Sequence, residues 1–211
     1  MRKLIIVFFI TSLISCKKKD TSTATTTSSA PATTTTTTTT TSTLIIGSSY
    51  QGGVIASIKH LGDIGYDPNI PHGLIAAPSD QSAGVTWDDG YQLVYGTSIP
   101  TSSLVGTGKI NTDSIVGRVG NFGSGNYAAK ICYDLVLNGY SDWYLPSRDE
   151  LNILVLNKTI IGGFYINTNP LYWSSSEYSY SHAYFQSFST SYSSSFNGKN
   201  QIYRVRAIRT F

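Results

Sequence analysis

Residues 21–43 contain only threonine, serine, alanine and a single proline. This composition limits which part of the chain can form a compact domain. A segment without charges or large apolar side chains cannot bury enough surface to offset the entropy lost on ordering it. We therefore expect residues 16–43 to form a disordered tether. The compact body must come from residues 44–211, which are long enough for one domain with its own core.

Residues 1–15 have the parts of a secretory signal: a positively charged start, a mostly apolar stretch over residues 4–14, and a small residue before Cys16. The apolar stretch is shorter than the roughly 20 residues that span a bilayer core, so we interpret residues 1–15 as a signal peptide. The tetrad Leu13-Ile14-Ser15-Cys16 resembles the bacterial lipobox, which predicts lipidation of Cys16 and an outer-membrane location at its periplasmic or cell-surface side. The alternative is a plain secretory signal with a chance cysteine.

The charge of the whole chain, +3, comes from its first 20 residues. Residues 44–211 hold ten Lys and Arg against eleven Asp and Glu, so no basic surface for nucleic acid is indicated. With Cys16 lipidated, Cys132 is the only remaining thiol. An intramolecular disulfide and a two-cysteine metal site are therefore excluded.

Two pairs of elements can be placed from local patterns. Residues 50–58 and 72–78 are short β-branched or apolar runs that predict a pair of strands. The spacing of Ala128, Ile131, Cys132 and Leu135 (i, i+3, i+4, i+7) predicts one helix, capped by Ser124 or Asn126 and ended by Asn138-Gly139. Ser147 and Glu150 form a capping-box pattern that predicts a second helix, which is apolar nearly all round and therefore buried.

The end of the chain alternates like a meander of strands. Asn197-Gly198 predicts a hairpin turn between Phe196 and Gln201. We expect residues 202–211 to form one straight strand whose side chains alternate between two faces. One face would carry Tyr203, Val205, Ala207, Arg209 and Phe211, and the other Arg204, Arg206, Ile208 and Thr210.

Six segments occur in an order that is typical of one family: YQGGVIASI, HGLIAA, YAAKICYDL, DWYLPSRDELNIL, YWSSSE and VRAIRTF. They resemble the Lcl C-terminal domain family, named for the C-terminal part of the Legionella collagen-like adhesin. The resemblance covers nearly all of residues 50–211. It implies an α+β, C-type-lectin-like fold with two helices, a long loop region and a C-terminal antiparallel β-meander. The activity that it implies is binding of sulfated glycosaminoglycans.

The segment from Tyr172 to Phe196 has nine aromatic residues and eleven serines. Because tyrosine combines an apolar ring with a polar tip, such a strand surface suits a sugar ligand. Four tyrosines are predicted ligand contacts: Tyr178, Tyr180, Tyr184 and Tyr192. The Trp and Phe residues are instead expected in the core: Trp173, Phe185, Phe188 and Phe196.

Arg204, Arg206 and Arg209 form the dense cationic feature of the domain. A guanidinium binds sulfate or carboxylate in bidentate fashion, so these three are also predicted ligand contacts. For Arg206 we favour a structural ion pair, with Glu177 as the available partner.

No cofactor is expected, although Asp88-Asp89 and Asp63 with Asp67 would offer oxygen atoms to calcium. The three histidines are scattered and no nucleophile elbow is present, so no catalytic or metal site is predicted. The sequence thus predicts a non-catalytic binding or adhesion lipoprotein with a glycan ligand. The alternatives are an assembly protein that binds another envelope protein and an enzyme of unrecognised mechanism.

Overall fold

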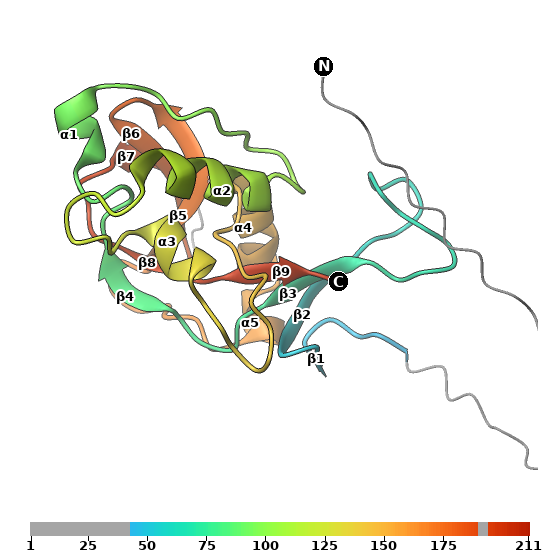
Figure 1. Ribbon diagram of the computed structural model, residues 1–211. Coiled ribbons are helices and arrows are strands. Elements are labelled where there is room, and N and C mark those ends of the chain that lie inside the picture. Colours follow the sequence, from blue (N-terminus) through green and yellow to red (C-terminus); the bar gives the residue numbers. More distant parts are fainter. Residues whose placement is uncertain (1–42, 190–193) are drawn as a thin grey trace, which may run out of the picture. The chain divides into compact units, whose positions relative to one another are not determined.

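The computed structural model describes residues 43–189 and 194–211, which form two sheets (Figure 1). The first sheet is antiparallel and has the order β1-β2-β3-β9. The second sheet has the order β4-β8-β5-β6-β7, and its β5 and β8 are parallel. The strands are β1 (Ser49–Tyr50), β2 (Gly53–Ile58), β3 (Gly73–Ala76), β4 (Ser82–Val85), β5 (Leu171–Ser179), β6 (His182–Ser187), β7 (Ser194–Gly198), β8 (Tyr203–Val205) and β9 (Ile208–Thr210).

Five helices lie in the described residues: α1 (Tyr91–Tyr95), α2 (Gly108–Val119), α3 (Ala128–Tyr133), α4 (Arg148–Leu156) and α5 (Lys158–Ile161). The α+β class is therefore confirmed, and the two predicted helices are α3 and α4. The C-type-lectin-like arrangement stays a prediction. Within the described residues, none of the helices has the length and apolar character needed to cross a membrane.

Helix α4 begins where the sequence predicts. The Ser147 hydroxyl accepts from the Glu150 main-chain N–H and the Glu150 carboxylate accepts from the Ser147 N–H, so the capping box is present. Leu151, Leu154 and Val155 are buried as expected. Leu156 is exposed, however, so the expectation of a helix buried all round is wrong at its C-terminal end.

Helix α2 was not predicted, because the region between the second strand and α3 reads as irregular. Its buried face carries the polar residues Asn111 and Thr112. Asn111 bonds to both main-chain groups of Ser102, and the Thr112 hydroxyl accepts from the Leu145 N–H. Buried polar groups are tolerated when they are hydrogen-bonded, so the first half of this face is polar, while Ile115 and Val119 in the second half join the core.

The predicted limits of α3 are partly wrong. Its N-cap is Tyr127, without a side-chain capping bond, rather than Ser124 or Asn126. The helix ends at Tyr133, and Asn138-Gly139 forms a separate turn between Leu137 and Tyr140, which pair with each other. Both turn residues have positive φ, which asparagine and glycine tolerate best.

The antiparallel meander is confirmed for β5, β6 and β7, which pair in chain order. The hairpin predicted at Asn197-Gly198 is wrong, because these residues belong to β7 and lie opposite Ala183 and His182. The chain turns after them, and β8 does not pair with β7. Instead β8 lies on the other side of β5, between β5 and β4.

The single straight strand predicted for residues 202–211 is also wrong. The chain leaves the second sheet at the end of β8 and enters the first sheet at β9, so Arg206 and Ala207 form a corner between the sheets. Four successive residues from Val205 to Ile208 are buried, which strand alternation does not allow. The other crossing, residues 77–81 between β3 and β4, lies beside this corner: the Ala77 N–H donates to the Ala207 carbonyl.

The core consists of two clusters of buried side chains. The first includes all three tryptophans, and the second includes Tyr172 and Phe188. Trp173 and Phe188 are fully buried and Phe185 packs against the first cluster, as expected. Among the described residues, the members of both clusters lie between residues 50 and 211 and belong to one compact unit.

Candidate functional site

Three aromatic side chains meet on one face of the β5-β6-β7 meander. Tyr184 and Phe196 are direct cross-strand partners, and the Tyr178 ring stacks on Phe196 with a centroid distance of 3.7 Å and an interplanar angle of 6°. Tyr184 meets both rings edge-on, at 5.6 Å and 6.3 Å. Tyr178 and Phe196 remain 51% and 43% exposed. We call Tyr178, Tyr184 and Phe196 the aromatic platform.

Helix α4 borders the aromatic platform. Farther along β6, the Gln186 amide donates to Asn152 of α4, and the Arg148 N–H at the start of the helix donates to the Ser176 hydroxyl of β5. The Arg148 guanidinium carbon lies 5.1 Å from the centre of the Tyr184 ring. Arg148 also pairs with Asp149 at 2.9 Å, and this bond raises the pKa of the guanidinium. A charged pair thus forms one edge of the platform.

Polar side chains surround the platform near Phe196. His182 meets the Phe196 ring edge-on at 6.0 Å, and its Nδ1 lies 2.8 Å from the Ser181 hydroxyl. Tyr180, in the turn between β5 and β6, is also exposed. These side chains therefore offer hydroxyl and imidazole groups that are able to donate or accept hydrogen bonds.

A buried group of charges supports the strands that carry the aromatic platform. The Lys199 amine, just after β7, lies 3.0 Å from the Glu177 carboxylate of β5 and 3.8 Å from that of Asp88. The same amine lies 4.3 Å above the Trp87 ring. Burial raises the pKa of Asp88, against the lowering effect of Lys199. Since Glu177 precedes Tyr178, the Lys199–Glu177 pair ties β5 to the end of β7 across β6.

Of the predicted tyrosine contacts, the structure brings Tyr178 and Tyr184 together. Tyr180 is exposed near them, but no ring contact with the platform is present among the described residues. Tyr192 and the predicted lipidation site, Cys16, lie outside the described residues.

The three predicted arginine contacts are engaged inside the protein. Arg206 is fully buried and bonds to the Asp80 carboxylate, so its partner is Asp80 and not Glu177. Arg204 pairs with the same carboxylate at 3.2 Å and stacks on Tyr165. Arg209 pairs with Asp142 at 2.7 Å, and this bond lowers the pKa of Asp142. The structural ion pair favoured for Arg206 is therefore present with a different partner, and the role of the three arginines as ligand contacts stays a prediction.

The aspartates considered for calcium bond mainly to main-chain N–H groups. Asp89 accepts from Ser124 and Gly125, Asp63 accepts from His60, and Asp67 accepts from Asn69. In residues 43–189 and 194–211, no group of three or more His, Cys, Asp or Glu side chains is arranged to hold a metal ion.

Sequence reasoning missed Phe196 and Arg148 as site residues. The sequence predicts Phe196 in the core together with the other Phe residues. In the structure Phe196 lies directly opposite Tyr184 on the neighbouring strand, so the two side chains lie on the same face of the sheet. Arg148 lies between the capping-box residues Ser147 and Glu150, and no pattern in the sequence marks it as a site residue. Its position at the first turn of α4 brings it to Tyr184 only once α4 is packed on β6.

A comparison with curated proteins finds no match for this chain. A family model described as the Lcl C-terminal domain matches residues 77–209, from the end of β3 into β9. The match covers the aromatic platform, its supporting charges and the corner between the sheets, and it spans more than half of the chain. The chain therefore belongs to the Lcl C-terminal domain family.

Proposed function

We propose that this protein is a non-catalytic binding module that holds a sugar ring on the aromatic platform. The proposal depends on one observation: Tyr178 and Phe196 are stacked on each other and both remain about half exposed. Large rings are normally placed in the core, where their burial stabilises the fold. A stacked pair held open at the surface instead offers an apolar area to the C–H face of a pyranose.

The groups around the platform fit the hydroxyls of such a ring. Tyr180, Ser181 and His182 provide hydroxyl and imidazole groups near Phe196, and the Arg148–Asp149 pair provides charged ones near Tyr184. Arg206 and Arg209 are buried in ion pairs and are not free for sulfate. The balance of charges in residues 44–211 is also close to zero. A neutral or weakly acidic glycan therefore suits this site better than a heavily sulfated one.

We further propose that the domain works at the cell envelope, tethered to the outer membrane through acyl chains on Cys16. The lipobox tetrad and the Thr-rich residues 16–43 support this placement. Nucleic acid is not a partner in this proposal, and neither calcium nor another cofactor takes part. Mass spectrometry of the Cys16 peptide from native membranes tests the anchor, because an unmodified or absent Cys16 in the mature chain would contradict it.

The direct test of the binding function is a glycan array probed with residues 43–211, with calcium and salt varied. We expect binding that is independent of calcium and that falls at least about tenfold when Tyr178 or Phe196 is replaced by alanine, because each change removes one stacking ring. Tyr133→Ala, at an exposed tyrosine of α3, is the matched control and should bind normally. Silence on all glycans, with an envelope protein captured through the same residues, would favour the assembly role instead.

A further inference from the structure

The loop between β2 and β3 has two aliphatic side chains that are almost completely exposed to solvent. Leu61 is 89% exposed and Ile64 is 94% exposed, and neither belongs to a core cluster of the described residues. Figure 1 shows this loop extending away from the strands that it joins. The loop has its own hydrogen bonds, since the Asp63 carboxylate accepts from the His60 N–H and the Asp63 carbonyl accepts from the Tyr66 N–H. Leu61 and Ile64 therefore lie on a turn that is held by its own hydrogen bonds.

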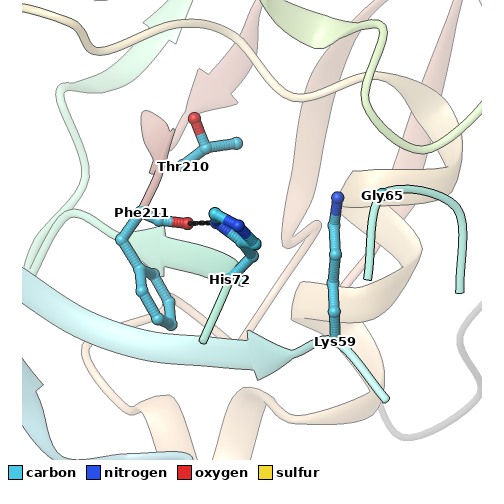
Figure 2. A pocket seen from close by; sticks show the side chains of 6 residues that line it. Lys59, Gly65, His72, Thr210 and Phe211 are labelled. Atoms are coloured by element: carbon cyan, nitrogen blue, oxygen red, sulfur yellow. Dashed lines mark hydrogen bonds between the residues drawn. The ribbon is translucent and has the colours of Figure 1, made fainter. Parts of the chain in front are cut away.

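A hollow of about 380 Å³ lies at the base of the same loop, between the loop and the ends of β3 and β9. Figure 2 shows Lys59 and His72 lining it, with the Lys59 amine beside Gly65. A Cβ atom added at Gly65 would lie 2.8 Å from that amine, so the amine lies alongside the residue that follows Ile64. His72 Nδ1 lies 3.2 Å from the main-chain oxygen of Phe211. Within the described part of the chain, no carboxylate pairs with Lys59.

We propose that this loop docks on a phospholipid surface, with Leu61 and Ile64 entering the acyl boundary and the Lys59 amine meeting a lipid phosphate. At a bilayer interface the acyl chains lie next to the lipid phosphates. The apolar side chains of Leu61 and Ile64 suit the acyl chains, and the nearby Lys59 amine suits a phosphate. A protein partner is less well matched, because a stable protein interface buries about 800 Å² on each side. The exposed apolar side chains of the loop, which are Leu61, Ile64, Ile70 and the less exposed Tyr66, together offer less than that.

The loop also carries two carboxylates, Asp63 and Asp67, each of which accepts a main-chain N–H. Their charge opposes that of Lys59, so the attraction to the membrane comes mainly from the apolar tip. His60, Tyr66 and His72 are the remaining titratable side chains of the loop and the hollow. Since one short apolar contact gives only weak and reversible membrane binding, the loop would orient the domain at a membrane rather than anchor it.

Vesicle co-sedimentation of residues 43–211, which belong to one compact unit, tests the proposal. The vesicles are an equimolar mixture of phosphatidylcholine and phosphatidylglycerol. We expect the Leu61→Ser/Ile64→Ser variant to bind at least about tenfold more weakly than the wild type, because both inserted side chains are lost. The matched control is Leu93→Ser/Val136→Ser, two residues of similar exposure on other elements, and it should bind like the wild type.

A second variant separates the charge from the apolar tip. Lys59→Gln should lower vesicle binding about fivefold, as expected for one basic residue at an anionic surface, and inorganic phosphate should not displace the protein. All these side chains are exposed or half-buried, so unchanged near-UV circular dichroism shows that each variant is folded. A wild type that stays in the supernatant, or a loop variant that binds equally well, would overturn the proposal. A dimer that depends on Leu61 and Ile64 in sedimentation velocity would assign the loop to a second copy of the chain instead.

Discussion

The Asp80 carboxylate lies 2.7 Å from the guanidinium of Arg206, at the point where the two crossings between the sheets run side by side. Asp80 belongs to the crossing from β3 to β4, and Arg206 belongs to the crossing from β8 to β9. Arg206 also donates to the Ala77 and Gly163 carbonyls, so each nitrogen of its buried guanidinium donates a hydrogen bond. This pair therefore joins the first sheet to the second.

Replacing Asp80 with asparagine should destabilise the domain strongly. The change leaves the buried Arg206 without its counter-charge, which costs about 3 to 5 kcal/mol of the free energy of unfolding. Urea unfolding of residues 43–211 measures the loss. The control is Asp134→Asn, which breaks an exposed pair with Lys130 and should cost about 0.5 kcal/mol or less. Equal unfolding midpoints for the two variants would show that the Asp80–Arg206 pair contributes little.

Lys199→Met should be similarly damaging, because it leaves Glu177 and Asp88 buried without their cation. We expect a loss of about 3 to 5 kcal/mol. The triple variant Asp88→Asn/Glu177→Gln/Lys199→Met removes all three charges and should recover much of this loss, since no unpaired charge remains. Thermal or urea unfolding distinguishes the two cases, and a triple variant as unstable as the single one would assign the loss to packing rather than to charge.

The buried carboxyl of Asp88 predicts a pH dependence. Burial raises its pKa, so the native protein holds a proton more tightly than the unfolded chain, whose aspartate pKa is about 3.9. The contribution of Asp88 to the free energy of unfolding therefore falls as pH rises from the unfolded pKa through the raised native pKa. Urea unfolding measured at several pH values across this window should show that the free energy of unfolding falls less steeply with rising pH in Asp88→Asn than in the wild type. The pKa of Glu150 is also raised by burial, so Glu150 still makes the free energy of unfolding fall with rising pH in the Asp88→Asn variant.

The surface change Asp113→Asn is the control for that measurement. Asp113 pairs with Lys109 at an exposed position of α2, and its replacement should leave the slope as it is. Identical slopes for Asp88→Asn and the wild type would contradict the assignment.

Ser147→Ala should weaken the start of α4. The hydroxyl caps the helix through the Glu150 N–H and also donates to the Leu104 carbonyl, so its loss should cost about 1 kcal/mol. Ser114→Ala, whose hydroxyl bonds only within α2 at an exposed site, should change the unfolding midpoint little. Should both serines cost the same, the capping bond would not be the source of the stability.

Elements with a strong local signal could be predicted from the sequence. The capping box of Ser147 and Glu150 fixes the start of α4, and the apolar runs around β2 and β3 predict their pairing. Helix α2 could not be predicted in this way. Its buried Asn111 and Thr112 form hydrogen bonds with Ser102 and Leu145, which lie outside the helix, so these polar residues interrupt the apolar pattern that Ile115 and Val119 continue.

The site shows the same division. The alternation of tyrosines and serines predicts an exposed aromatic surface at Tyr178 and Tyr184, and these two residues do meet. Phe196 and the corner at Arg206 depend on how strands from different parts of the chain are paired, and local alternation carries no information about that. The Asn197-Gly198 pair was misleading because a frequent turn sequence here lies inside a strand.

The burial of Cys132 has a practical consequence for experiments on residues 43–211. This single thiol is fully buried in α3, and burial raises its pKa, so the reactive thiolate is suppressed while the domain is folded. Maleimide or disulfide reagents should therefore modify the domain only as it opens. The rate of labelling then reports the opening of the α3 region directly, and a cysteine introduced at a surface position can carry a fluorophore without competition from the native one.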